Sequence, residues 1–154
     1  IIDLANNILS NYSQVYLPKS INRIGEKPVI KTFNDTNALI NHFNTEILEK
    51  INNLNGSLGI IVYDENLLEK TRQYLQDNID VKDNLIFLNK DSKITYQPKA
   101  VYLTHFDNCK GLEFSEVYVL GLNIKQINNF SDAKKAFVAV TRAMNNITIL
   151  GIEK

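Results

Sequence analysis

Cysteine is nearly absent from this sequence: the 154 residues contain only one, Cys109. A single thiol cannot form a disulfide within the chain, and it excludes a zinc site built from cysteines. We therefore expect a reducing, cytoplasmic setting for the protein.

Long hydrophobic runs and an excess of one charge are missing as well. No apolar stretch approaches the roughly 20 residues that cross a bilayer, so no membrane association is predicted. The first residues have neither the cationic nor the long apolar region of a signal peptide. There is also no starting Met, and we expect the chain to be part of a longer protein.

The charges of the chain balance, with 17 Lys and Arg residues against 17 Asp and Glu residues. The chain as a whole therefore has no net field that would attract nucleic acid. Contact with a nucleic acid strand would have to come from a local patch or from a partner domain.

No internal repeat, low-complexity tract or linker rich in Pro and Gly divides the sequence. Residues 1–154 are therefore predicted to form one domain. Hydrophobic residues make up 44% and charged residues 22% of the chain, which is ordinary for a globular protein.

Apolar strands alternate with amphipathic helices along the chain. Strands are expected at residues 28–33, 58–63, 85–89, 100–104, 117–121 and 147–150. Helices are expected at residues 3–12, after a cap at Asp35 or Thr36 to about residue 54, after a cap at Asp64 to about residue 76, and at 132–143. This alternation predicts an α/β domain with a mostly parallel sheet and helices on both faces.

The loop after the strand at 100–104 is the first candidate for a ligand site, because ligands of open parallel sheets bind beyond the carboxyl ends of strands. It covers residues 104–114. Gly111 lets the backbone approach a ligand closely, Lys110 can neutralise a phosphate, and Glu113 can accept hydrogen bonds from a sugar hydroxyl. The alternative is a solvated turn in which Lys110 and Glu113 are ordinary surface charges.

The helix expected at 132–143 carries an arginine near its end. Ser131 is the expected cap. The stripe expected to pack on the sheet comprises Ala133, Ala136, Phe137 and Val140. Arg142 lies about 180° from Ala133 around the helix, so we expect it to reach outward to a ligand or a facing domain. The alternative is an ordinary exposed arginine, favoured near a helix end by the dipole.

Two segments together resemble motifs V and VI of the UvrD/Rep family of superfamily 1 helicases. They are Lys110-Gly111-Leu112-Glu113-Phe114 and Phe137-Val138-Ala139-Val140-Thr141-Arg142-Ala143. The usual family forms are KGLEF or KGLEW, and (Y/F)VAxTRA, in this order. Residues 3–9 also resemble the stretch that follows motif IV of the family, so the resemblance covers the whole chain.

The resemblance implies the second RecA-like domain (domain 2A) of an ATP-dependent DNA helicase or translocase with the P-loop NTPase fold. ATP with Mg²⁺ would be bound mainly by the N-terminal RecA-like domain of the same protein. Arg142 would be the catalytic residue that reaches the γ-phosphate of this ATP. The other implied ATP contacts are Glu113 on the ribose, Gly111 at the close approach of the loop, and Thr141, which would hold the arginine helix in place.

The resemblance also implies contacts with single-stranded DNA in the strand and turn ahead of the first motif. The candidate DNA contacts are Thr104, His105, Asn108 and Lys110. Many relatives have T-x-H-x-x-K here, and this chain has Asp107 at the histidine position, where a carboxylate repels phosphate. Ser115 replaces the usual Asp after GLEF.

Several family features are missing from the sequence. No G-x-x-x-x-G-K-[ST] loop and no acidic Walker B strand occur, so the chain alone is predicted neither to hydrolyse ATP nor to unwind DNA. Residues 64–99 are too few for the large 2B insertion, which indicates a compact form of the HelD type. One alternative is a nucleotide-gated binding module that acts on RNA polymerase, as HelD-like relatives do. Another is a doubly wound domain with a different ligand.

Overall fold

A six-stranded sheet forms the centre of the structure, with the strand order β1-β6-β5-β2-β4-β3. The strands are β1 Val29–Phe33, β2 Leu58–Val62, β3 Leu85–Leu88, β4 Val101–His105, β5 Phe114–Leu120 and β6 Ala143–Ile152. Every neighbouring pair is parallel, which confirms the predicted sheet. The computed structural model describes residues 28–54, 56–78, 85–88, 100–109 and 111–153. The helix predicted at residues 3–12 lies outside these ranges.

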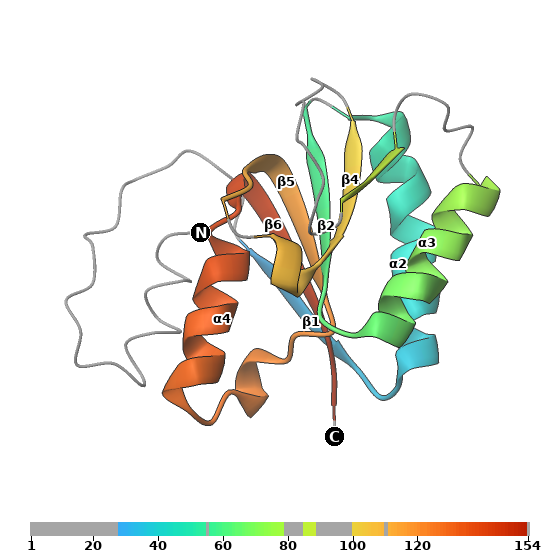
Figure 1. The fold of residues 1–154 in the computed structure, drawn as a ribbon. Helices are drawn as coiled ribbons and strands as arrows, with labels where there is room; N and C mark the ends of the chain where they lie inside the picture. Colours follow the sequence, from blue (N-terminus) through green and yellow to red (C-terminus); the bar gives the residue numbers. More distant parts are fainter. Residues whose placement is uncertain (1–27, 55, 79–84, 89–99, 110, 154) are drawn as a thin grey trace.

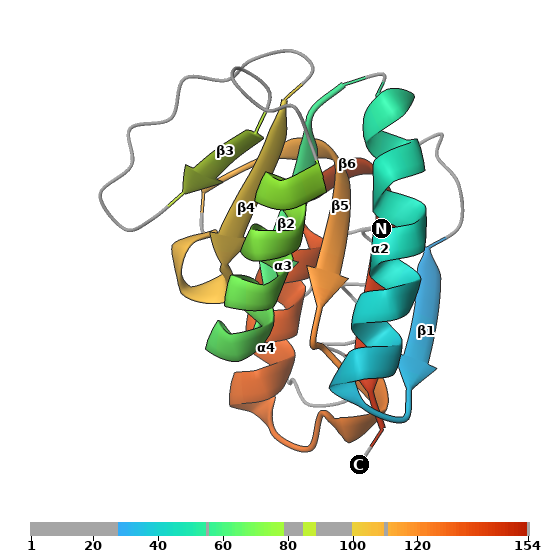
Figure 2. The same cartoon turned by 90° about the vertical axis from the view of Figure 1, so that its right-hand side faces the viewer.

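Helices cover both faces of the sheet, as predicted (Figures 1 and 2). α2 (Thr36–Asn52) and α3 (Glu65–Asn78) pack on one face, and α4 (Phe130–Val140) packs on the other. Each face has its own cluster of buried hydrophobic side chains. Within the described ranges, no helix is both long and apolar enough to cross a membrane.

α2 and α3 begin at aspartates that cap them. Asp35 Oδ1 accepts a hydrogen bond from the backbone N–H of Ala38 at 2.8 Å, and Asp64 Oδ1 accepts one from Asn66 at 2.7 Å. These bonds satisfy N–H groups that the first turn of a helix leaves without a partner. The buried residues of α2 recur every fourth position: Leu39, Phe43 and Ile47. Both helices are confirmed close to their predicted bounds.

β2 is the buried centre of the sheet and pairs with β4 and β5. All five of its residues are buried, and a nearly continuous apolar run such as Leu58–Val62 is typical of a strand that is buried on both faces. A Cβ atom at Gly59 would overlap the ring of Phe114. Glycine at this position therefore leaves room for the ring of Phe114, the first residue of β5.

The segments that carry the two motifs differ from the predicted elements. β5 begins at Phe114 instead of Val117, and β6 begins at Ala143 instead of Ile147, because Phe114 and Ala143 are partners in the parallel ladder. The ladder is irregular between Phe114 and Glu116. Because of this irregularity, a search for alternating apolar and polar residues does not find the start of β5.

α4 is shorter than predicted, and both its ends are shifted. Asn129 caps it instead of Ser131, since Asn129 Oδ1 accepts a hydrogen bond from the N–H of Asp132 at 2.8 Å. The helix ends at Val140, and Thr141 is its C-cap. Arg142 therefore lies in the turn after the helix, and its predicted place on the outer helix face is wrong. The chain must leave the helical path there because Ala143 already belongs to β6.

The packing face of α4 also differs from prediction by one residue. Its fully buried residues are Ala133, Ala136, Ala139 and Val140. Phe137, expected in this stripe, is only partly buried, although it packs against the same cluster. Small side chains along the stripe let the helix approach the sheet closely.

Candidate functional site

The two motif segments meet at the amino ends of β5 and β6. The backbone N–H of Phe114 donates a hydrogen bond to the carbonyl of Arg142 at 2.9 Å, and Phe114 pairs with Ala143 in the ladder. Residues that are far apart in the sequence are thereby held side by side. The turn that contains Thr141 and Arg142 therefore lies next to the end of the 104–114 loop.

The 104–114 loop runs from the carboxyl ends of the strands to their amino ends. It begins at the carboxyl end of β4, the edge where ligands of parallel sheets usually bind, and ends at the amino end of β5. A 3₁₀ turn at Phe106–Asn108 starts it. The rule that ligands bind at the carboxyl ends of strands therefore applies to the first half of this loop. The second half, which leads to Phe114 and Arg142, lies at the amino ends of the strands.

Two buried residues anchor the loop on the α4 face. Cys109 and Leu112 belong to the buried cluster on that face, and the N–H of Leu112 donates to the carbonyl of Cys109 at 3.1 Å. The ring of Phe106 stacks on Tyr63, with ring centroids 4.7 Å apart. The loop is thus packed on the domain over much of its length.

Gly111 and Glu113 are the exposed residues of this loop next to the buried Leu112. Gly111 has a φ of 84°, in the left-handed region that favours glycine. A Cβ atom there would meet nothing within 4 Å, so the backbone angle, and not crowding, is what favours glycine. Lys110, the predicted phosphate contact, lies outside the described residues.

Arg142 closes the end of α4 with its own side chain. Its Nε donates to the carbonyl of Val138 at 3.0 Å, and its Nη2 donates to Thr141 Oγ1 at 3.2 Å. Its backbone N–H donates to the carbonyl of Ala139 at 3.2 Å. A cation is favourable at this end because the last carbonyls of a helix carry partial negative charge.

The buried thiol of Cys109 lies within the electrostatic reach of Arg142. Burial raises the pKa of Cys109 to about 11, and the positive charge of Arg142 partly opposes this shift. Burial likewise raises the pKa of Tyr63 above its ordinary value. Both groups are therefore neutral at physiological pH, and Cys109 acts as a small packing residue.

The predicted DNA contacts Thr104 and His105 lie at the carboxyl end of β4, and Asn108 lies in the 3₁₀ turn that follows it. Thr104 is buried, and His105 and Asn108 are partly buried. His105 Nδ1 accepts a hydrogen bond from the N–H of Asp107 at 3.1 Å and lies 3.4 Å from the Asp107 carboxylate. One nitrogen can accept the amide proton or, when protonated, donate to the carboxylate, but it cannot do both. The most exposed group here is the Asp107 side chain, at 77%.

A groove of about 630 Å³ lies on the face of the sheet that α2 covers. Sequence analysis did not identify it. β1, α2, β5 and β6 contribute to its walls, with none of the predicted site residues among them. The available signal was the polar residues Glu116, Tyr118, Asn146 and Thr148, which alternate with buried apolar residues along β5 and β6.

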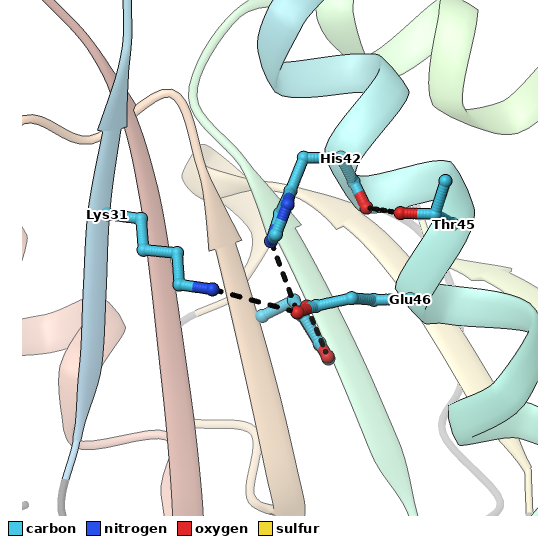
Figure 3. A network of polar contacts seen from close by, with 5 residues as sticks. Lys31, His42, Thr45 and Glu46 are labelled. Atoms are coloured by element: carbon cyan, nitrogen blue, oxygen red, sulfur yellow. Dashed lines mark hydrogen bonds and ion pairs between the residues drawn. The ribbon is translucent and has the colours of Figure 1, made fainter.

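Glu46 is the centre of a polar network at this groove (Figure 3). It accepts a hydrogen bond from the Tyr118 hydroxyl at 3.3 Å. Its Oε1 lies 3.1 Å from His42 Nε2 and 3.9 Å from Lys31 Nζ. The His42 approach is an ion-pair distance without hydrogen-bond geometry. Burial raises the pKa of Tyr118, and the Glu46 charge adds to this effect.

The charges of the groove are largely matched within it. Besides the Lys31 contact, Lys50 Nζ lies 2.7 Å from Glu116 Oε1. Within the described ranges, no three His, Cys, Asp or Glu side chains converge on a point where they could hold a metal ion.

Comparison with known proteins places the chain by fold. No protein-family model matches the sequence, and no curated protein matches it. The structure is similar to that of the C-terminal domain of a possible DNA helicase from Lactobacillus plantarum WCFS1. The TM-score is 0.69 and the identity 17%, over 97% of this chain and 82% of that one. An arterivirus helicase, nonstructural protein 10 in complex with DNA, matches with a TM-score of 0.46 and 11% identity, over 81% of this chain and 28% of that one. The first comparison confirms the RecA-like α/β fold.

Proposed function

We propose that this chain is the second motor domain of an ATP-dependent DNA helicase or translocase of the UvrD/Rep type. In this proposal ATP and Mg²⁺ are held mainly by an N-terminal RecA-like domain of the same protein. This chain supplies Arg142 to the γ-phosphate and the loop around Gly111 and Glu113 to the ribose. Closure of the two domains around ATP would drive movement along single-stranded DNA.

The observation that carries the proposal is the hydrogen bond from Phe114 to the carbonyl of Arg142 at 2.9 Å. It joins the two motifs whose pairing resembles the helicase family. A shared ATP site needs the ribose contact and the arginine on one surface. This bond and the β5–β6 ladder support the proposal because they hold the backbones of Phe114, the neighbour of Glu113, and Arg142 together. The likeness in fold to a helicase C-terminal domain supports the same function.

The chemistry of Arg142 suits stabilisation of a phosphoryl-transfer transition state. A guanidinium is always charged and presents a planar fork that matches phosphate oxygens. In other NTPases an arginine supplied from a neighbouring domain raises the rate by about 10³–10⁵. Since the sequence has no phosphate-binding loop of its own, we infer that the arginine acts on a nucleotide bound elsewhere.

A second candidate function is a nucleotide-gated binding module that acts on RNA polymerase, with little or no unwinding. The observation that favours it is Asp107, whose carboxylate is 77% exposed where relatives present a histidine to DNA. A negative charge at this position opposes the approach of a phosphate backbone.

ATP hydrolysis by the full-length protein, with and without single-stranded DNA, separates the two functions. A motor that moves on DNA hydrolyses ATP faster when DNA is present, and Asp107→Asn should strengthen DNA binding severalfold by removing a repulsive charge. Glu69→Gln, which removes an exposed carboxylate in α3, is the matched control. Hydrolysis that does not respond to DNA in either protein would reject the translocase and support the binding module.

A further inference from the structure

The Arg142 guanidinium has five N–H donors arranged along its edges, and its hydrogen bonds to described residues use one of these edges. Nε donates to the Val138 carbonyl at 3.0 Å, and Nη2 donates to Thr141 Oγ1 at 3.2 Å. Both donors belong to the side edge of the group. Among the described residues, Nη1 has no hydrogen-bond partner, and Arg142 forms no ion pair.

Thr141 is itself held firmly enough to act as an anchor. Its backbone N–H donates to the Phe137 carbonyl at 3.0 Å. Its hydroxyl lies 2.9 Å from that carbonyl and 3.1 Å from the carbonyl of Val138. A hydroxyl has one proton to donate and lone pairs that accept. Thr141 can therefore donate to α4 and accept from Arg142 at the same time.

We propose that Thr141 is a positioning residue, which fixes the side edge of the Arg142 guanidinium on the end of α4 so that the Nη1–Nη2 end faces the phosphate. This inference rests on the proposed function of Arg142. It differs from a role of Thr141 in holding the helix, because it assigns to its hydroxyl the orientation of one charged group.

Orientation before binding matters here because donors that are already aimed need no rearrangement as charge develops in the transition state. A free arginine side chain samples many rotamers, and ordering it reduces the gain from each new contact. The contact of Nε with Val138 uses one of the last carbonyls of the helix, which lack the usual N–H partner one turn further on. It leaves the Nη1–Nη2 end of the fork available for a phosphate.

The inference is tested by steady-state ATP hydrolysis of the full-length protein with Thr141→Val and Thr141→Ser. Valine keeps the branched shape and removes the hydroxyl, so kcat should fall about tenfold while KM for ATP stays within about twofold. Serine keeps the hydroxyl and should restore kcat to within about twofold of the unchanged protein. Thr71→Val is the matched control, because the Thr71 hydroxyl also bonds a carbonyl one turn back, that of Leu67 at 2.7 Å, but lies in α3.

A second measurement, in this chain, reads how firmly the side edge of the Arg142 guanidinium is held. The NMR signal of the Arg142 Nε–H group, assigned by its loss in Arg142→Ala, should exchange with water about tenfold faster in Thr141→Val than in Thr141→Ser. Equal exchange rates, or an unchanged kcat in Thr141→Val, would overturn the positioning role. If kcat is unchanged in Arg142→Ala, the proposed function itself is wrong, whereas a collapse in Arg142→Ala with no effect of Thr141→Val leaves that function standing.

Discussion

At the scale of single residues, Glu113 owes its exposure to its neighbours. Leu112 and Phe114 are both buried, and in an extended segment alternate side chains point to opposite sides. Glu113 therefore lies on the surface beside the Arg142 turn. The KGLEF pattern places its acidic residue outward by burying the two apolar residues around it.

Replacement of Glu113 by Ala tests the proposed ribose contact of this residue. Loss of a charge-assisted hydrogen bond in a partly exposed site should raise KM for ATP about tenfold in the full-length protein, with kcat within about threefold. Glu65→Ala, at the exposed start of α3, should leave both constants unchanged. A drop in kcat with no change in KM would assign Glu113 to the chemical step instead of to binding.

Cys109 links the packing of the loop to pH. Its folded pKa, about 11, lies above its ordinary value of 9.0, mainly because of burial. The stability that this neutral thiol contributes is therefore fully present below about pH 9, and it is lost as the pH rises toward 11. Tyr63 and Tyr118, whose pKa values are raised as well, titrate in alkaline solution too, so a variant is needed to isolate the effect.

Urea unfolding of the chain and of Cys109→Ala between about pH 7 and pH 11 measures this contribution. The difference in unfolding free energy between the two proteins should be constant up to about pH 8.5. Above that pH, the unfolding free energy of the unchanged protein should fall relative to that of Cys109→Ala. A difference that stays constant up to pH 11 would show that Cys109 does not titrate as its burial requires.

At the scale of elements, the start of α4 shows how a cap is chosen. Both Asn129 and Ser131 are good capping residues, and the sequence alone favours neither strongly. Asn129 is selected because Phe130 already belongs to the helix, and Asn129 Nδ2 also contacts the Asp132 carboxylate at 2.9 Å. The predicted cap was therefore wrong by two positions.

Asn129→Ala should lower the unfolding free energy of the chain by about 1 kcal/mol, the usual effect of losing a cap. Ser131→Ala, inside the first turn, should change it by less than about 0.5 kcal/mol. Thermal or urea unfolding measures both. A larger loss of unfolding free energy in Ser131→Ala than in Asn129→Ala would show that Ser131 is the cap.

The elements were predicted well where a local pattern determines them. β2 has a continuous apolar run, and Asp35 and Asp64 cap their helices in the structure. Prediction was weaker at Phe114 and Ala143, where pairing between distant strands decides the boundary. The place of Arg142 was wrong for the same reason: the ladder contact of Ala143 ends the helix before Arg142, and periodicity along α4 cannot reveal that contact.

At the scale of the whole molecule, the candidate residues lie at opposite ends of the parallel strands. Thr104 and His105 end β4 at its carboxyl end, and the Arg142 turn leads into the amino end of β6. The order of the motifs in the sequence indicated that both segments belong together, but not which edge they share. The groove around Glu46 was missed because its residues come from four separate elements and form no motif.

Hydrolysis of ATP by the full-length protein with Arg142→Ala tests the central claim, that this domain completes an ATP site formed elsewhere. The kcat should fall by about 10³–10⁵, while the Kd for ATP stays within about threefold. Arg72→Ala, which removes an arginine that packs near Phe87 in another part of the domain, should leave both values intact. An unchanged kcat in folded Arg142→Ala protein would contradict the account.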